Sequence, residues 1–396
     1  MMETYQAPPE ISRIQQRSLI IGVVGLVLLL AGALVLQAPE QFFQSYLVGY
    51  IFWVGIALGC LAICMLQHLS GGAWGLVIRR LLEAGARTMP LMALLFLPLL
   101  LGAYKYHLYP WAVAEEVNRS AVLKHKALYL NLPFFLARAV FYFAAWILLA
   151  HFLSKWSSEQ DRSSDPLIIR RLQVLSGPGL VLYGLTVTFA SIDWVMSLEP
   201  EWGSTMFGML LMGGQAVSAM SFIIAMAVLL AKREPMSRVF APHHFHDFGK
   251  LLLAFIMLWA YFSFSQFLII WAGNLPEEIP WYLHRLRTGW RYVGLALVLL
   301  HFALPFVLLL SRDLKRNART LVLVAVMVIV MRFVDLLWMI APEFNKASFR
   351  LHWMDLVAPI GVGGLWLAVF TWQLKSRPLL PLRDPNLQEV LEQTAH

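Results

Sequence analysis

Ten long apolar runs dominate this 396-residue sequence. An α-helix rises 1.5 Å per residue, so about 20 apolar residues cross a hydrocarbon core about 30 Å thick. Because lipid cannot satisfy exposed backbone groups, spanning segments are limited to helices and closed barrels. The runs therefore predict an all-α integral membrane protein with ten transmembrane helices. We expect these at 19–36, 46–66, 88–104, 131–153, 174–196, 204–230, 248–271, 290–310, 321–340 and 354–374.

The composition agrees with a chain that lies in lipid. Hydrophobic residues make up 59% of it and charged residues only 14%, whereas about a quarter of a soluble protein is charged. No segment between the runs is long enough to bury a core of its own. We expect an N-terminal segment (1–18), one transmembrane domain (19–374) and a C-terminal tail (375–396).

The first apolar run has two interpretations. Arg13 and Arg17 precede it, and Ala31-Gly32-Ala33 resembles a signal-peptidase site, so a signal peptide is one of them. The run stays apolar through Leu36, which favours the other, an uncleaved first helix.

The distribution of positive charge predicts the orientation. With ten spans, the termini and every second loop share one side, and that side carries 19 of the 31 lysines and arginines against 8 on the other. Because basic loops stay in the cytoplasm, both termini are expected there. The formal charge of +8 is thus explained by topology rather than by nucleic acid. We expect a multi-pass protein of the bacterial cytoplasmic membrane, with the lipid bilayer as one partner.

Two segments outside the runs are more than linkers. Segment 74–89 mixes apolar and basic residues at helical spacing, which predicts a helix at the cytoplasmic interface. Segment 271–290 carries three tryptophans and paired acids, as expected for the outer interface.

The polar residues inside the apolar runs are the functional candidates, because lipid excludes such groups unless they serve a purpose. Asp193 and Arg138 fall in the outer part of their runs, and Gln266 and Asp335 also lie on the outer side of the midplane. Arg332 and His301 lie near the middle, and Asp355 begins the last run. On the expected topology nearly all of these groups lie in the outer half, which predicts a polar cavity that closes near the midplane. The inner half is expected to be oily, with ionisable groups only at its rim (His68, His151, His244, His246, Asp247, Lys250). The full candidate set is Arg138, Asp193, Gln215, Gln266, His301, Arg332, Asp335 and Asp355.

Each candidate has a structural and a functional interpretation. Arg332 and Asp335 are spaced i, i+3, so they share a helix face and either form a structural salt bridge or help to pass protons. Asp193 either pairs with Arg138 or caps a helix, or it exchanges protons. Glu199 lies in an acidic turn after Asp193 and is either a solvated residue or the mouth of a proton path.

Cofactor motifs are missing from the sequence. Cys60 and Cys64 are four residues apart and form no CxxC or CxxCH pattern, so we interpret them as small core residues. His301 has no second histidine at its depth, which argues against a bis-histidine haem. A metal site is one interpretation of the cluster His243, His244, His246 and Asp247, but the sequence favours a cytoplasmic turn with interfacial histidines.

Two blocks carry a family resemblance. FASIDWVMSLEPEWGSTMFGML (189–210) and FSFSQFLIIWAGNLPEEIPWY (262–282) resemble the polysulfide-reductase-like (NrfD-like) membrane subunits of bacterial alternative complex III, a quinol:electron acceptor oxidoreductase, and among these the F subunit. The resemblance covers most of the fourth to ninth runs but not the termini.

The resemblance implies two four-helix bundles plus two peripheral helices. It also implies a chain without redox cofactors of its own, in a complex with a second NrfD-like subunit, iron–sulfur and haem c subunits, and menaquinol or another quinol as substrate. Members of this kind are assigned a proton path. The expected path is Arg138, Asp193, His301, Arg332 and Asp335, with Glu199, Gln215, Gln266 and Asp355 holding water or forming the mouth.

Two other functions remain open at this stage. The chain could bind quinone directly, with Asp193 or His301 accepting the quinol proton. It could also be a stand-alone secondary transporter, although such folds usually show matched broken helices in two repeats, and we find no such pair.

Overall fold

The computed structural model describes residues 5–163 and 165–387, and within these ranges the protein is all helical, without strands. Ten of the described helices are long and apolar enough to cross a membrane, so the protein is an all-α, multi-pass integral membrane protein. The spans are α1 (Glu10–Val35), α2 (Pro39–Ser70), α3 to α5 (Ala73–Lys105), α8 (Leu132–Gln160), α9 with a following turn (Pro166–Leu198), α10 (Phe207–Leu230), α11 (Pro242–Gly273), α13 to α14 (Trp290–Leu310), α16 (Ala318–Phe344) and α17 (Met354–Lys375).

Prolines divide two of these spans into shorter helices. Proline has no N–H to donate to the carbonyl four residues earlier, so it interrupts a helix at that point. Pro90 and Pro98 separate α3 (Ala73–Ala86), α4 (Met89–Leu95) and α5 (Leu97–Lys105). Pro305 follows a π-helical turn, Leu297–Ala303, between α13 (Trp290–Ala296) and α14 (Leu304–Leu310).

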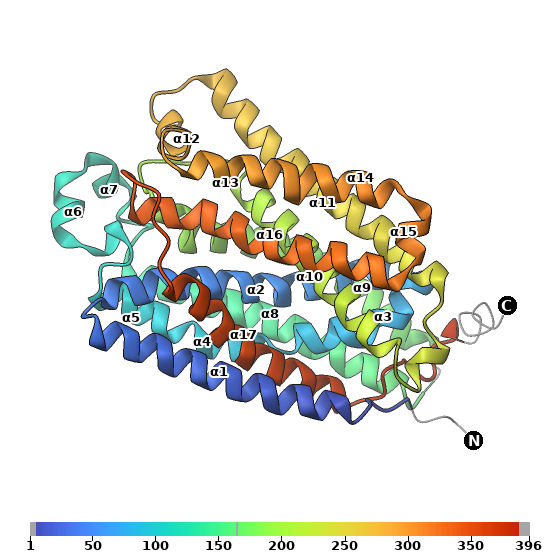
Figure 1. Cartoon of the computed structure of the whole chain (residues 1–396). Helices are drawn as coiled ribbons and strands as arrows, with labels where there is room; N and C mark the ends of the chain where they lie inside the picture. The colour runs from blue at the N-terminus through green and yellow to red at the C-terminus, as the bar shows by residue number, and fades with distance from the viewer. Residues whose placement is uncertain (1–4, 164, 388–396) are drawn as a thin grey trace.

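The spans form two four-helix bundles and a peripheral pair, as expected (Figure 1). The described helices of the first bundle are α2, α3 to α5, α8 and α9, and those of the second are α10, α11, α13 to α14 and α16. The seam between the bundles is formed by α2, α9 and α10. Helices α1 and α17 pack on each other outside the first bundle, and a Cβ at Gly25 would lie 2.8 Å from Gly361 Cα. Small residues let the backbones of these two helices approach closely.

Both described ends of the chain lie at one end of the bundles, where Leu379 N donates to Tyr5 O at 2.7 Å. We call this the inner end, in line with the topology expected from the basic loops. The opposite, outer end carries the short helices α6 (Ala114–Arg119), α7 (Ala121–Lys126) and α12 (Ile279–Leu286), as Figure 1 shows. The remaining short helix, α15 (Arg312–Arg316), lies at the inner end.

Three segments differ from the sequence expectations. Helix α1 begins at Glu10, so half of the expected N-terminal segment is helical. Helix α3 is not an interfacial helix, because 12 of its 14 residues are buried and it continues into a span. The start of the tail packs into the protein, with Leu379, Leu380 and Leu387 buried. Residues 1–4, 164 and 388–396 of the expected terminal segments and loop lie outside the described residues.

Candidate functional site

Arg138 on α8 and Asp193 on α9 form a buried ion pair near the outer end of the first bundle. Arg138 Nε donates to Asp193 Oδ2 and Nη2 donates to Oδ1, both at 2.8 Å, in a bidentate arrangement. The Tyr142 hydroxyl also donates to Oδ2 at 2.8 Å. Asp193 has no exposed surface, and three donors compensate the cost of burying its charge. The pairing that the sequence left open is therefore present.

Aromatic rings enclose the cationic side of this pair. The Arg138 guanidinium carbon lies 3.8 Å from the ring centre of Tyr129 and 4.4 Å from that of Phe134. Its Nη1 donates to the Tyr129 carbonyl at 2.9 Å. Burial raises the pKa of the Tyr129 hydroxyl, and the nearby Asp193 carboxylate raises it further. Tyr129 thus stays neutral beside the pair.

A second buried ion pair lies inside the second bundle. Arg332 and Asp335 on α16 are 2% and 3% exposed, and Arg332 Nη1 donates to Asp335 Oδ2. Trp259 Nε1 on α11 donates to the same oxygen at 3.1 Å. The i, i+3 spacing thus brings the two side chains together, as predicted.

His301 lies against this second pair. Its ring centre is 4.3 Å from that of Trp259 in an edge-to-face arrangement, and the side chain has no exposed surface. Neither ring nitrogen has a hydrogen-bond partner among the described residues. A buried polar group without a partner lowers the stability of a protein by about 1–3 kcal/mol, so a buried histidine at position 301 calls for an explanation. His301 also sits in the π-helical turn, and such turns are frequent at functional sites.

Gln215 connects the two bundles at the seam. The Tyr183 hydroxyl on α9 donates to Gln215 Oε1 on α10 at 2.6 Å. The neighbouring residue, Gly214, faces the second ion pair, because a Cβ at position 214 would overlap the Arg332 guanidinium. The Tyr183–Gln215 contact therefore joins α9, which carries Asp193, to α10, which packs against Arg332.

A cavity of about 20 Å³ lies beside Gln215 at the seam, and Ser191 and Trp194 also line it. A cavity must have a volume of about 10–15 Å³ to hold one water molecule. Trp194 Nε1 is buried and has no hydrogen-bond partner within the described ranges. The cavity thus has room for one water between the Asp193 end of α9 and Gln215, but no room for a quinone ring.

The remaining candidates lie apart from one another at the outer end. Gln266 accepts a hydrogen bond from Ser204 Oγ at 3.0 Å. It also contacts the Tyr282 hydroxyl, whose pKa burial raises to about 12. Glu199 is half-buried and forms an ion pair with Lys346.

Asp355 lines an outer cavity of about 600 Å³, together with Glu40, Arg350 and His352. Its Oδ1 accepts from Ser45 Oγ at 2.5 Å, and its Oδ2 accepts from His352 N at 2.8 Å. Glu199, the expected mouth, does not line this cavity.

One outer ion pair was missed from sequence. Arg285 on α12 has no exposed surface, and its Nη2 donates to Glu343 Oε1 at 2.7 Å. The guanidinium also donates to the carbonyls of Trp281, Trp338 and Met339 at 2.7–3.0 Å. Burial lowers the pKa of Arg285, and Glu343 opposes that shift. The only signal in the sequence was the position of Arg285 four residues after Trp281, which we had assigned to an interfacial aromatic belt.

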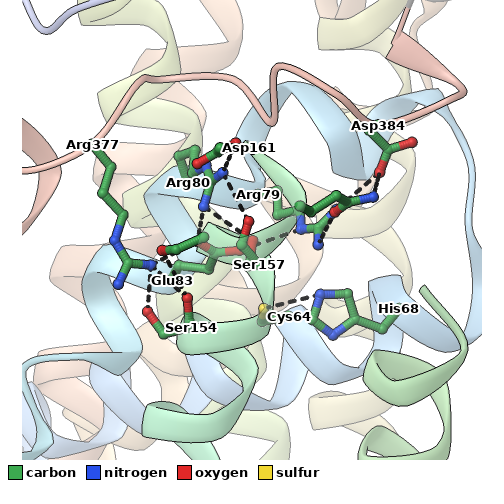
Figure 2. A network of polar contacts seen from close by, with 12 residues as sticks. Cys64, His68, Arg79, Arg80, Glu83, Ser154, Ser157, Asp161, Arg377 and Asp384 are labelled. Atoms are coloured by element: carbon green, nitrogen blue, oxygen red, sulfur yellow. Dashed lines mark hydrogen bonds and ion pairs between the residues drawn. The ribbon is translucent and has the colours of Figure 1, made fainter. Parts of the chain in front are cut away.

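The inner end holds a larger polar network that the sequence did not reveal (Figure 2). Arg80 on α3 donates to Glu83 Oε2 at 2.7 Å and to Asp161 Oδ1 at 2.5 Å. Arg79 donates to Glu83 Oε1 at 3.3 Å and to Asp384 Oδ2 at 3.0 Å. Arg79, Arg80 and Glu83 are each only 2–3% exposed. The network thus adds buried ionisable groups at the inner end of the first bundle to those that were expected at the rim.

One of the histidines at the start of α11, His244, caps that helix. His244 is buried, and its Nδ1 accepts from Ala241 N at 3.2 Å, which caps the helix. No group of three or more His, Cys, Asp or Glu side chains in residues 5–163 and 165–387 has an arrangement for a metal ion. Cys60 and Cys64 are buried and free.

No protein-family model matches the chain, and a search of curated proteins found no similar sequence.

Proposed function

We propose that this chain is a membrane subunit of a quinol-oxidising electron-transfer complex of the alternative complex III type, in the bacterial cytoplasmic membrane. It supplies a proton-conducting half-channel from the outer end and a surface on which partner subunits dock. Electrons pass through partners that carry haem c and iron–sulfur clusters beside a second NrfD-like subunit, and menaquinol or another quinol is the substrate of the complex. The sequence blocks at 189–210 and 262–282 support this family assignment.

The observation that carries the proton path is a buried Arg–Asp contact in each bundle, together with the Tyr183–Gln215 hydrogen bond that joins the bundles at the seam. Ion pairs used only for packing gain little, because desolvating two charges offsets most of their attraction. One such pair near the outer end of the first bundle and another inside the second bundle therefore favour a role beyond stability.

The chemistry of the groups suits proton exchange at two points. In this proposal Asp193 and Asp335 exchange protons, and each carboxylate is in contact with an arginine. The Tyr183 hydroxyl can both donate and accept, and Gln215 Oε1 accepts from it. A water molecule in the cavity beside Gln215 would extend the Tyr183–Gln215 contact toward the Arg138–Asp193 pair. His301, whose two ring nitrogens have no hydrogen-bond partner among the described residues, is the proton acceptor beside the Arg332–Asp335 pair.

The test is proton release by the assembled complex in liposomes. We expect Asp193→Asn with Asp335→Asn to lower the protons released per quinol oxidised. The matched control is Glu115→Gln with Asp313→Asn, two exposed carboxylates, which should leave the ratio unchanged. An unchanged ratio in the Asp193/Asp335 variant would show that the pairs are structural.

Two further measurements keep the test decisive. If the double variant does not assemble, Tyr142→Phe removes only one hydroxyl that donates to Asp193 and should still lower the ratio. Co-purification tests the assignment to a complex, since haem-bearing and cluster-bearing partners should appear at equal stoichiometry. Solute transport by the purified chain alone would instead favour a secondary transporter.

Direct quinone binding has one observation in its favour. The outer cavity of about 600 Å³ lies in the size range of small-molecule sites, and Asp355 and His352 line it. A carboxylate and an imidazole are groups that can accept a quinol proton. Photo-crosslinking with an azidoquinone should then label the segments around Gln41 and His352. Labelling confined to partner subunits would exclude this alternative.

A further inference from the structure

A basic pocket of about 550 Å³ lies at the inner end, between α4, α8 and the chain after α17. Its charged lining consists of Arg87, Lys155, Arg162 and Arg377, with Glu159 as the single carboxylate, so the formal charge of its lining is strongly positive. None of the functions proposed above uses this pocket.

Three of its four cations form no ion pair with a described residue. Among the described residues, no carboxylate lies within ion-pair distance of Arg87, Lys155 or Arg162. Arg87 Nη1 is 3.2 Å from its acceptor, Ser376 Oγ. The fourth cation, Arg377, is fixed in place: its Nη1 donates to Ser154 O and Oγ at 2.7 Å and lies 3.8 Å from Glu83 Oε2 (Figure 2). The pocket therefore offers fixed and free positive charge to an anion.

Hydroxyl and apolar groups complete the lining. Ser154 and Ser158 contribute hydroxyl groups, which can donate to phosphate oxygens. Pro90, Ile147 and Ala150 form an apolar wall on the side toward the membrane centre. This combination fits a group that is charged at one end and apolar at the other.

The surface next to the pocket faces lipid. Leu94 and Leu148 are 61% and 53% exposed on α4 and α8, and Trp372 on α17 is 55% exposed. These three side chains lie closer to the membrane centre than the pocket does. Leu94 is one helical turn from Pro90 and Leu148 is about two turns from Lys155. Trp372 is five residues before Arg377. An acyl chain can therefore lie along this surface while a headgroup occupies the pocket.

We propose that this pocket binds the phosphate of an anionic phospholipid from the inner leaflet, whose acyl chains pack along α4, α8 and α17. Basic pockets between spanning helices on the cytoplasmic side are suited to such headgroups. The negative charge of the bound lipid would offset part of the positive charge of Arg87, Lys155 and Arg162. It would also hold the chain after α17 against α8 through Arg377.

The experiment measures lipid binding to the purified, delipidated chain by native mass spectrometry. Phosphatidylglycerol and phosphatidylcholine with the same acyl chains are the probes. We expect the wild type to bind phosphatidylglycerol at least about tenfold more tightly than phosphatidylcholine. Each charge removed should lower the affinity for phosphatidylglycerol about fivefold. The test variant is Arg87→Gln, Lys155→Gln, Arg162→Gln. The control removes three exposed cations elsewhere on the inner side, in Arg170→Gln, Arg171→Gln, Lys232→Gln.

The outcomes separate the sources of the phosphate. Loss of the preference in the test variant alone supports the proposal. Equal binding of the two lipids, or an equal loss in the control, overturns it. If inorganic phosphate binds the wild type while phosphatidylglycerol does not, the ligand is a soluble anion and the lipid is excluded. Should the triple variant fail to fold, Lys155→Gln alone removes one exposed charge and should still lower the preference.

Discussion

The Arg332 guanidinium fills the space beside Gly214 that a side chain at position 214 would need. Helix α10 thus comes close enough to α16 to shield the second ion pair only because position 214 has no Cβ. This contact ties the seam residue Gln215 to the Arg332–Asp335 pair, since Gly214 and Gln215 are consecutive.

Gly214→Ala should therefore destabilise the protein. The added methyl overlaps the guanidinium, so Arg332 must move away from Asp335, and overpacking of this kind costs about 1–3 kcal/mol. We expect a lower melting temperature by tryptophan fluorescence in nanodiscs. The control is Gly184→Ala on α9, where no heavy atom lies within 4 Å and alanine favours the helix. Equal melting temperatures for the two variants would mean that the space at position 214 is not restricted.

The Arg138–Asp193 pair should show strong coupling in a double-mutant cycle. Removing one partner leaves a buried charge without its counter-ion, which costs about 3–5 kcal/mol. We expect Arg138→Gln and Asp193→Asn each to lower stability in this range. The double variant should be less destabilised than the sum of the two, because no buried charge is left unpaired.

An exposed pair supplies the reference for this cycle. Arg119 lies 3.6 Å from Glu116, and its side chain is 72% exposed. Arg119→Gln should change stability by less than about 1 kcal/mol. Purely additive effects at Arg138 and Asp193 would contradict the interpretation of their contact as a single buried unit.

Arg285→Lys should be destabilising although the charge is kept. The guanidinium uses all three of its nitrogens, on three carbonyls and Glu343, and an ammonium cannot reach this set of acceptors. It also stacks on Trp281, with the guanidinium carbon 3.5 Å from the ring centre. Arg287→Lys, two residues away and exposed, is the matched control. A lower melting temperature is expected for the first variant only.

Asp384→Asn should loosen the chain after α17. Asp384 Oδ2 accepts from Arg79 Nη1 at 3.0 Å and from Gln160 Nε2 at 3.1 Å, so the carboxylate fixes this segment to α3 and α8. We expect faster proteolytic cleavage in the segment 378–387 in inside-out vesicles. Asp313→Asn, an exposed position, should leave the rate unchanged. An unaltered rate in Asp384→Asn would show that the buried leucines alone hold the segment.

The spans and the two ion pairs were predictable because their signals are local. Ten apolar runs of sufficient length gave ten spans, and the i, i+3 spacing of Arg332 and Asp335 gave a shared face. Asp193 and Arg138 were at similar expected depth, so their pairing was one of the alternatives.

The inner network was not predictable from the same signals. Basic residues between apolar runs normally mark a loop, and this rule placed Arg79 and Arg80 at the interface. Their burial depends on carboxylates from distant segments, Asp161 and Asp384, and no spacing rule relates these to α3. Arg285 was missed for the same reason, since Glu343 lies 58 residues away.

His301 allows a proton role to be separated from a packing role. Its two ring nitrogens have no partner within the described ranges, so replacing the imidazole by a benzene ring removes an unsatisfied polar group from the interior. His301→Phe should therefore leave the melting temperature unchanged or raise it, while Trp259 keeps an aromatic neighbour. If His301 accepts protons beside Asp335, the same variant should lower proton release per quinol in the assembled complex. His125→Phe, exposed in the outer loop, is the control. Unchanged stability together with unchanged proton release would leave His301 no part in the path.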